Sequence, residues 1–317
     1  MEASAADEMR GQAAVPVAVI ICTHNPRRDY LERCLTALEH QTLPKDFWEL
    51  IIVDNASAPQ KAPTNFVLPH PRARLVGEPK LGLTPARLRG IRESKADLLV
   101  LVDDDNVLDP DYLETALRIA REMPFLGSWS GQCRPEFEAP PPEWTRRYWG
   151  NLVIRQFEQD VWSNLPRLPE TMPCGAGLCV RRIAAERYLL LHESGERSVQ
   201  LDRTGTSLMS GGDNDLAGCA CDIGLGVGLI SALKLTHLIP QQRLTEEYLA
   251  RLAEGIAYSS TVLDAERGMM PIKRGVMGRV VDVLRAMRVD KRSRRITLAV
   301  YRGRNRAAQQ LMHHARF

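Results

Sequence analysis

The chain has 317 residues, of which 44% are hydrophobic and 26% are charged, a composition typical of a soluble protein with one large α/β domain or two smaller ones. No segment approaches the roughly 20 uninterrupted apolar residues that a membrane-spanning helix needs, because Asp222 interrupts the most apolar stretch. The first residues are acidic and lack the apolar core of a signal peptide. We therefore expect a cytoplasmic protein.

The net charge of +3 conceals an uneven distribution. Residues 268–317 contain 13 Lys and Arg against 2 Asp and Glu, a charge of +11, whereas the rest of the chain carries −8. Such a basic segment either touches the inner face of an anionic membrane or forms a helix packed on the protein with its arginines in water, and the second interpretation is slightly favoured. We expect no nucleic-acid partner. The seven cysteines lack C-x-x-C spacing and predict reduced thiols rather than a zinc site.

Strands alternate with helices over the first 125 residues. Residues 1–14 are small and polar, and we expect them to be disordered. Apolar, β-branched runs predict strands at 17–22, 48–53, 74–76 and 98–102, and helical spacing predicts helices at 30–41, 86–91 and about 110–122. This alternation indicates a parallel sheet with right-handed crossovers, and each strand ends in polar residues, as at a nucleotide-binding edge.

The character of the chain changes after residue 125. Residues 132–173 are rich in proline and contain three tryptophans, which indicates a structured insertion rather than a linker. We expect a strand at 174–180, a helix opened by the glycine-rich segment 211–216, a late edge strand at 233–240 and helices from Thr245 onward. The expected organisation is one half at 15–125, a second half at 126–245 and a basic helical extension at 246–317.

Three consecutive carboxylates, Asp103, Asp104 and Asp105, follow the apolar strand at 98–102. A strand buried on both faces places them at its carboxyl end, where open α/β sheets bind ligands. Adjacent carboxylates ionise together only with a cationic partner, and their oxygens suit Mg²⁺ or Mn²⁺ holding a phosphate. The alternative is a solvated acidic turn that caps the helix beginning near Pro110.

Six short motifs occur in one order along the chain. They are T-H-N at 23–25, I-V-D-N-A-S at 52–57, G-L-T-P-A-R at 82–87, V-D-D-D at 102–105, G-A-G at 175–177 and G-D-N-D-L at 212–216. Together, over roughly residues 17–240, they resemble the inverting glycosyltransferases of family 2. The resemblance implies the GT-A type of α/β nucleotide-binding fold, a mainly parallel central sheet flanked by helices, here with a helical C-terminal extension. It also implies sugar transfer from a nucleotide diphosphate sugar to a carbohydrate or lipid-linked acceptor in cell-surface glycan synthesis.

The resemblance assigns roles on the donor side. Asp103 and Asp105 match the D-x-D positions of the family, so they would hold Mn²⁺ or Mg²⁺, with Asp103 and Asp104 also on the donor. Asp54 looks like the carboxylate that binds the nucleobase, although D-N-A-S is also a good turn sequence. The remaining donor-binding candidates are Thr23, Asn25, Lys80 and Arg87.

The family takes its general base from a Glu-Asp pair at a helix start, where this chain has Gly212 and Asp213. Asp213 is therefore the expected base, and Asp215 is the competing carboxylate on the acceptor side. A carboxylate at such a position also serves simply as a helix cap. His237 lies where some GT-A enzymes add a metal ligand, although a lone histidine is more often structural.

The tryptophans of the insertion have two interpretations. Aromatic rings stack on the apolar faces of sugars, so Trp144, Trp149 and Trp162 would shape an acceptor pocket; equally, they would fill a small local core. Two other functions remain open at this stage. One is a sugar-phosphate nucleotidyltransferase, which normally has a glycine-rich basic loop after the first strand. The other is an inactive GT-A scaffold, suggested by the missing glutamate.

Overall fold

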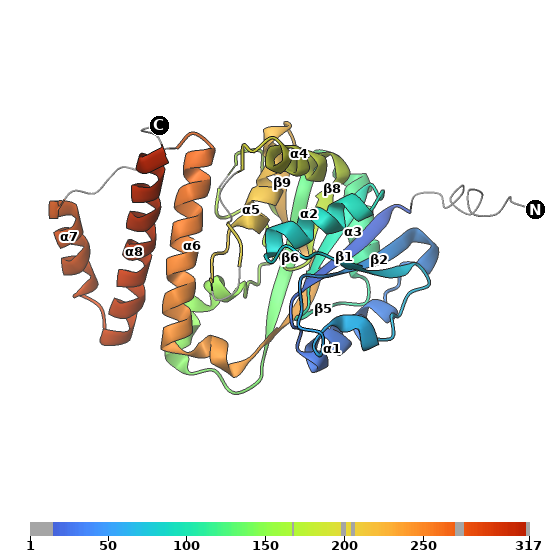
Figure 1. Ribbon diagram of the computed structural model, residues 1–317, viewed down its shortest axis with the longest axis horizontal. Coiled ribbons are helices and arrows are strands. Elements are labelled where there is room, and N and C mark those ends of the chain that lie inside the picture. Colours follow the sequence, from blue (N-terminus) through green and yellow to red (C-terminus); the bar gives the residue numbers. More distant parts are fainter. Residues whose placement is uncertain (1–14, 167, 198–200, 204–206, 270–275, 315–317) are drawn as a thin grey trace, which may run out of the picture.

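The computed structural model describes residues 15–166, 168–197, 201–203, 207–269 and 276–314 (Figure 1). The disorder expected at 1–14 lies outside these residues. In chain order the strands are β1 (Val17–Thr23), β2 (Trp48–Asp54), β3 (Ala73–Gly77), β4 (Leu98–Asp103), β5 (Asn106–Leu108), β6 (Leu126–Phe137), β7 (Val161–Ser163), β8 (Leu178–Arg181) and β9 (Gly226–Ile239). The α-helices are α1 (Arg28–Glu39), α2 (Leu83–Glu93), α3 (Tyr112–Glu122), α4 (Arg182–Glu193), α5 (Gly212–Asp222), α6 (Glu246–Glu266), α7 (Val276–Ala286) and α8 (Lys291–His314). Short 3-10 segments are η1 (Lys45–Phe47), η2 (Pro63–Asn65), η3 (Glu143–Leu152) and η4 (Gln241–Leu244).

The strands form one sheet in the order β3-β2-β1-β4-β8-β6-β9-β5, with β7 paired to β9. Strands β3, β2, β1 and β4 run parallel, which confirms the expectation for the first half. Beyond β4 the sheet is mixed: β8 is antiparallel to β4 and β6, β9 is parallel to β6, and β5 and β7 are antiparallel to β9. The protein therefore has a mixed α/β fold whose parallel half carries the Asp-rich turn.

Helices cover both faces of this sheet. Along β1, Val17, Val19 and Ile21 face one core, which α1 and α3 complete. Ala18 and Ile20 face the other core, to which α2, α4 and α5 contribute. Because successive side chains of a strand point to opposite faces, a continuous apolar run is what a strand buried on both sides requires. This burial fixes the carboxyl ends of β1 and β4 side by side.

The second half differs from the sequence expectations at two strands. The strand β6, which overlaps the start of the structured insertion expected at 132–173, was not predicted, because its sequence L-G-S-W-S-G-Q-C-R-P-E-F is poor in β-branched residues and so lacks a strand signal. The strand expected at 233–240 begins at Gly226 and lies inside the sheet, because β9 pairs with β5, β6 and β7. Gly226 and Gly228 hide this strand from propensity arguments. A Cβ on either would come within 3.2 Å of β7.

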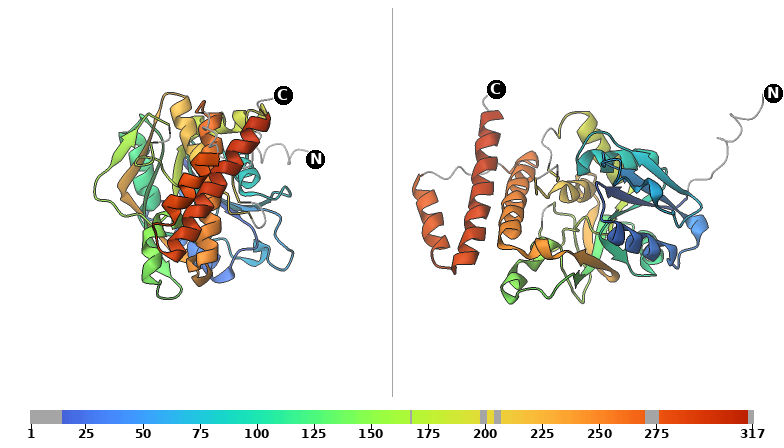
Figure 2. Two further views of the ribbon diagram at one scale, coloured as in Figure 1. Left: turned by 90° about the vertical axis from the view of Figure 1, so that its left-hand side faces the viewer. Right: turned by 60° about the horizontal axis from the view of Figure 1, so that its bottom comes forward.

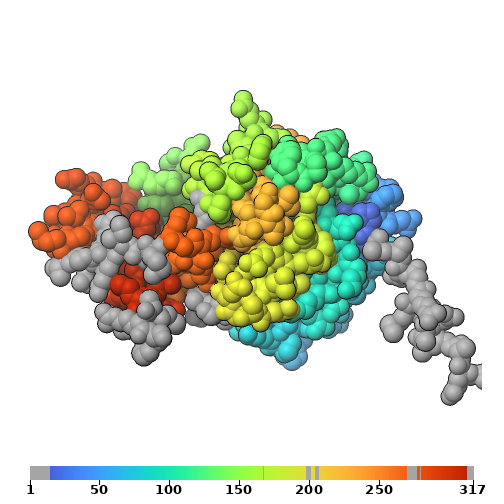
Figure 3. All heavy atoms as spheres, turned by 90° about the horizontal axis from the view of Figure 1, so that it is seen from above, coloured from blue at the N-terminus to red at the C-terminus, as the bar shows by residue number. Residues whose placement is uncertain are grey.

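The C-terminal helices extend from one end of the molecule. Figures 1 and 2 show α6 and α8 side by side, with α7 farthest from the sheet, and Figure 3 shows the same end as spheres. A Cβ at Gly303 of α8 would lie 2.2 Å from the backbone oxygen of Glu254 in α6, so glycine permits this close helix contact. Arg302 and Arg306 also pair with Glu254. Among the described helices, none combines the length and apolar character needed to cross a membrane.

Candidate active site

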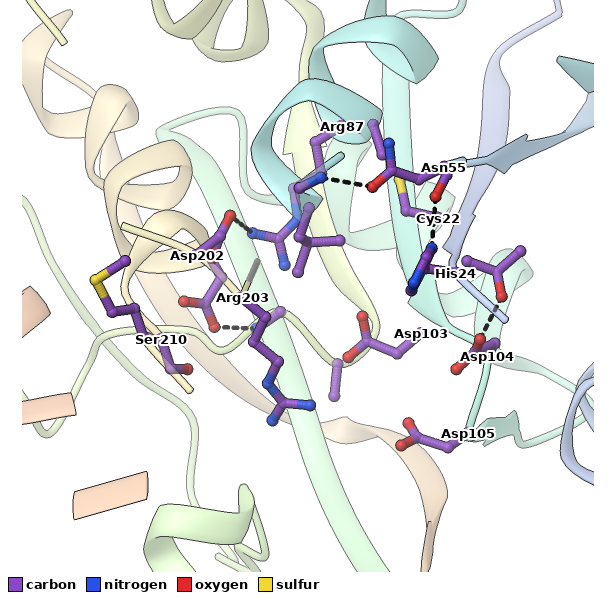
Figure 4. Close-up of a pocket in the computed structure, with 18 of the residues that line it drawn as sticks. Cys22, His24, Asn55, Arg87, Asp103, Asp104, Asp105, Asp202, Arg203 and Ser210 are labelled. Carbon is purple, nitrogen blue, oxygen red and sulfur yellow. Dashed lines mark hydrogen bonds and ion pairs between the residues drawn. The ribbon is translucent and has the colours of Figure 1, made fainter. Parts of the chain in front are cut away.

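A cavity of about 330 Å³ opens at the carboxyl ends of β1 and β4 (Figure 4). The three aspartates after β4 line one side, and residues from α2, the segment before α5 and α5 itself line the other. The sequence-predicted residues that it brings together are Thr23, Arg87, Asp103, Asp104, Asp105, Asp213 and His237. Ligand cavities at this edge are usual in open α/β sheets, and this volume lies in their ordinary range of about 300–1,000 Å³.

The three aspartates after β4 have different surroundings. Asp104 accepts a hydrogen bond from the Thr23 hydroxyl, yet burial and the charges of Asp105 and Asp103 raise its pKa to about 7. Burial and the neighbouring Asp105 also raise the pKa of Asp103. For Asp105, burial alone would raise the pKa, but His237 and Arg243 hold it well below its usual range. Burial and like charge therefore disfavour the ionised forms of Asp103 and Asp104, whereas Asp105 is stabilised as a carboxylate.

Asp105 is held by an arginine and a histidine. Arg243 from η4 lies 2.9 Å from Oδ2 of Asp105, and Nε2 of His237 lies 3.5 Å from the same oxygen. His237 reaches this position because it pairs with Asn106 across the β5–β9 ladder. Arg243 also approaches Nε2 of His237 at 3.1 Å. The sequence analysis missed Arg243, since a single arginine after a strand carries no recognisable pattern.

The donor set suits a divalent metal in its chemistry. Carboxylate oxygens are the ligands that Mn²⁺ and Mg²⁺ prefer, and a bound cation would favour the ionised forms of Asp103 and Asp104. The Nδ1 atom of His237 is also buried without a hydrogen-bond partner among the described residues. Within the same residues, no three His, Cys, Asp or Glu side chains are gathered closely enough to enclose an ion. The residue types therefore suit a divalent metal, but in the arrangement described Asp105 is paired to Arg243 and the side chains do not converge on one point.

Asp213 lies in the first turn of α5 and lines the same cavity as the aspartate cluster. Its Oδ2 accepts a hydrogen bond from the backbone N–H of Gly175 at 2.7 Å, and its Oδ1 accepts one from Asn214 N–H at 2.9 Å. The positive end of the helix dipole favours a carboxylate at this position. Asp213 is therefore oriented by two backbone donors and faces the same cavity as Asp103.

Asp202 is a buried carboxylate that the sequence analysis did not identify. It accepts hydrogen bonds from Thr84 and Arg87, each at 3.0 Å, and from the N–H of Gly212 at 3.1 Å. Burial raises its pKa, and the attraction of Arg87 partly offsets that effect. One carboxylate thus joins the first turns of α2 and α5. It lies in a short segment without helical or strand periodicity, so no sequence signal marked it.

Comparison with known proteins identifies the family of the chain. The family model described as glycosyl transferase family 2 matches residues 18–179, about half of the chain, including β1, β4 and the three aspartates. The chain belongs to glycosyl transferase family 2. A putative glycosyltransferase, EpsH, of Bacillus subtilis is 28% identical over 106 residues, covering 33% of this chain and 30% of EpsH. An N-acetylglucosaminyltransferase of Sinorhizobium fredii is 30% identical over 138 residues, covering 41% and 32% of the two chains.

The curated relatives share only part of their length with this family 2 chain, which spans about a third of each of these two. Solved structures extend the likeness of the fold. TarS residues 1–349 of S. aureus superimposes with a TM-score of 0.51 over 95% of this chain and 91% of that chain, at 13% identity. The same TarS fragment in complex with UDP gives the same values. At this identity the likeness concerns the fold, which is the GT-A fold expected from the motifs.

Three of the donor-binding candidates in this family 2 chain lie outside the residues that line the cavity. Asp54 accepts a hydrogen bond from the N–H of Ser57 at 3.3 Å, the turn alternative considered for D-N-A-S. The Asn25 amide oxygen accepts one from Ala58 N–H at 2.9 Å. Lys80 is exposed. Arg87 lines the cavity, but its guanidinium is buried in the ion pair with Asp202. The donor roles of these residues remain predictions.

The acceptor-side candidates are also dispersed. Asp215 is buried between Arg197 and Arg267, with N–O distances of 3.0 and 3.1 Å, and does not line the cavity. Trp144 and Trp149 pack around the core formed by α6, α8 and η3, the local-core alternative. Trp162 on β7 is half exposed, with its ring 4.8 Å from that of Phe125. Asp215 is thus held in ion pairs, and Trp144 and Trp149 are packed against a hydrophobic core. The acceptor roles of these residues remain predictions.

Several cavity residues had no assigned role before the structure. They are Cys22, His24, Asn55, Asp202, Arg203 and Arg243. Asn55 accepts from Gly82 N–H at 2.7 Å and donates to the carbonyl of Lys80 at 2.8 Å, so it shapes the turn before α2. Gly82 has φ 139°, a conformation that favours glycine. His24 and Asn55 lie within the family motifs at 23–25 and 52–57, and this was the sequence feature that could have indicated them as cavity residues.

Proposed function

We propose that this protein is a metal-dependent inverting glycosyltransferase that moves a sugar from a nucleotide diphosphate sugar to a carbohydrate or lipid-linked acceptor, in the synthesis of a cell-surface glycan. Membership in glycosyl transferase family 2 supports glycosyl transfer. The observation that carries the proposal is one cavity lined by both the Asp103–Asp105 cluster and Asp213. In this proposal, residues 15–125 bind the donor, residues 126–245 complete the acceptor side, and the enzyme works in the cytoplasm.

Asp213 is suited to act as the general base. The acceptor hydroxyl would give its proton to the Asp213 carboxylate while its oxygen forms a bond to the anomeric carbon. The bond from that carbon to the diphosphate oxygen breaks on the opposite side, so the configuration inverts. The N–H groups of Gly175 and Asn214 hold the carboxylate in a fixed orientation. Such positioning lowers the entropy cost of bringing base and hydroxyl together.

The donor side must neutralise the charge of the departing nucleotide diphosphate. Asp103, Asp105 and His237 would hold Mn²⁺ or Mg²⁺, which when bound supplies positive charge to the diphosphate. Arg203 and Arg243 line the same cavity and provide further cationic groups. Thr23 fixes Asp104 by its hydrogen bond. Family membership favours this reaction over nucleotidyl transfer, and an inactive scaffold is distinguished by experiment.

A panel of nucleotide diphosphate sugars tests the proposal, with the full chain, Mn²⁺ and a thermal-shift readout followed by measurement of nucleotide diphosphate release. We expect one donor to raise the melting temperature only with metal, because a ligand that binds the folded state stabilises it. Asp105→Asn should abolish this metal-dependent binding. Asp213→Asn should retain donor binding and reduce release and transfer at least 100-fold.

Asp97→Asn is the matched control, because Asp97 is an exposed carboxylate just before the opposite end of β4. It should leave both donor binding and release unchanged. Donor binding without release by the wild type would indicate a scaffold. A loss of donor affinity in Asp213→Asn as large as its loss of release would contradict the assignment of the base.

A further inference from the structure

The helix α7 turns its apolar face away from the protein. Asp282 and Ala286, one turn apart, are 3% and 0% exposed, whereas Met277, Leu284 and Met287 are 79%, 55% and 58% exposed. Val280 and Val281 are also exposed. On a helical wheel, positions 277, 280, 281, 284 and 287 form one stripe opposite positions 282 and 286. We call this stripe of five residues the α7 apolar stripe.

The stripe has basic surroundings. Arg285 and Arg288 beside it are exposed, as are Lys291 and Arg292 at the start of α8. Monomeric soluble proteins rarely leave a contiguous apolar surface of this kind uncovered. A second copy of the chain would bring two strongly basic surfaces together, which disfavours self-association. An anionic lipid surface complements both the charge and the apolar stripe.

We propose that the α7 apolar stripe docks on an anionic membrane surface, with the stripe among the acyl chains and the flanking Arg and Lys side chains at the headgroups. α8 holds α7 in place and is itself fixed to η3 and α6, for example through the 3.0 Å hydrogen bond from Tyr148 to Ser293.

Vesicle co-sedimentation of the full chain tests this proposal, with phosphatidylglycerol–phosphatidylcholine vesicles against pure phosphatidylcholine vesicles. We expect the wild type to pellet with the anionic vesicles and to be released by high salt. The double variant Val280→Ser, Leu284→Ser should bind at least tenfold more weakly. Its side chains are exposed, so it should fold normally by circular dichroism.

The matched control is Ile183→Ser, Leu190→Ser on α4, where both side chains are more than half exposed but lie outside the stripe. It should pellet like the wild type. Equal pelleting of the α7 variant and wild type would overturn the proposal. So would a wild type that stays in the supernatant, or a dimer in sedimentation equilibrium that the α7 variant dissociates. Because the assay measures binding alone, its outcome is separate from that of the glycosyl-transfer assay.

A second inference concerns Gly212, which stands where the family pattern has a glutamate before the base. A Cβ built on Gly212 would lie 2.1 Å from Oδ2 of Asp202, so the Asp202 carboxylate fills the space into which a side chain at 212 would project. Asp202 also holds Arg87 and the N–H of Gly212. Any side chain at 212 would therefore force the Asp202 carboxylate to move from this position.

We infer that Asp202 replaces the missing glutamate as a positioning residue, supplying from a separate segment the carboxylate that orients Arg87 and the start of α5. The inference rests on the proposed function. A charge relocation tests it: Asp202→Ala and Gly212→Glu singly, and the two together, assayed for nucleotide diphosphate release and for thermal stability.

Each single change should reduce kcat at least tenfold. Asp202→Ala removes the carboxylate, and Gly212→Glu places a side chain that overlaps the Asp202 carboxylate and repels it by like charge. The double variant should recover kcat at least fivefold over either single variant. Recovered stability without recovered kcat would show a merely structural carboxylate and overturn the inference. No gain in either property would also overturn it. If the wild type releases no nucleotide diphosphate, the proposed function fails first, independently of these variants.

Discussion

Two groups of buried carboxylates on either side of α5 differ in how they are neutralised. Behind the helix, Asp215 lies between two buried arginines, Arg197 and Arg267. In the cavity, Asp103 has no hydrogen bond or ion pair to its carboxylate among the described residues, and burial raises its pKa. A buried carboxylate with complete partners stabilises the fold, whereas one without partners is driven toward its protonated form and marks a candidate ligand site. On this criterion Asp215 is a structural carboxylate, and Asp103 is a candidate ligand-binding carboxylate.

The strongest test of this contrast is Asp215→Asn. Removing its charge leaves Arg197 and Arg267 buried with one carboxylate fewer, so we expect the free energy of unfolding to fall by about 3–5 kcal/mol. Urea denaturation measures the change. Glu32→Gln breaks the exposed Arg28–Glu32 pair on α1 and should change stability by less than about 0.5 kcal/mol. A comparable loss in both variants would remove the distinction.

A pH-dependent test uses Glu266, which faces Arg197 at 3.5 Å. Burial outweighs the attraction of Arg197 and raises the pKa of Glu266 from 4.5 to about 7. Between these values the unfolded chain loses a proton that the folded chain retains, so the wild type loses stability as pH rises from about 4.5 to 7. Glu266→Gln should remove about 1–3 kcal/mol of this dependence. Urea unfolding at pH 5 and pH 8 measures it, and identical pH profiles would count against the assignment.

The smallest expected effect on stability is that of Asp103→Asn. Because burial and Asp105 disfavour the ionised form, the neutral amide should leave the free energy of unfolding unchanged or raise it by up to about 1 kcal/mol in metal-free buffer. Thermal denaturation with a chelator provides the measurement. A loss above about 2 kcal/mol would place Asp103 with the architectural carboxylates.

The first half of the fold was predicted well from the sequence, because its strands are specified by residues within each strand. β1, β2 and β4 contain apolar runs with several valines or isoleucines and end in polar residues, so both their existence and their shared edge follow from the sequence pattern. β6 and β9 were misjudged because glycine, serine and proline occupy positions whose strand conformation is imposed by neighbours. Pattern arguments do not detect pairing between strands about a hundred residues apart.

The candidate site shows the same division. The aspartates after β4 and Asp213 were identifiable, since they follow recognisable elements and match family motifs. Asp202 and Arg243 were not, because each acts through contacts with residues distant in the chain: Arg87 for the first and Asp105 for the second. Conversely, Asp215 has the same motif context as Asp213 but points into an arginine cluster, a difference set by which side of α5 faces the cavity.

The junction at η4 has a geometric consequence. Only Pro240 separates β9 from η4, and only Thr245 separates η4 from α6, so the strand bearing His237 passes into the helix that carries α8 without a flexible linker. Arg243 within this junction is clamped to Asp105. If α7 rests on a bilayer, the height of the cavity above the lipid is set by a rigid spacer. An acceptor attached to lipid would then have to match that height.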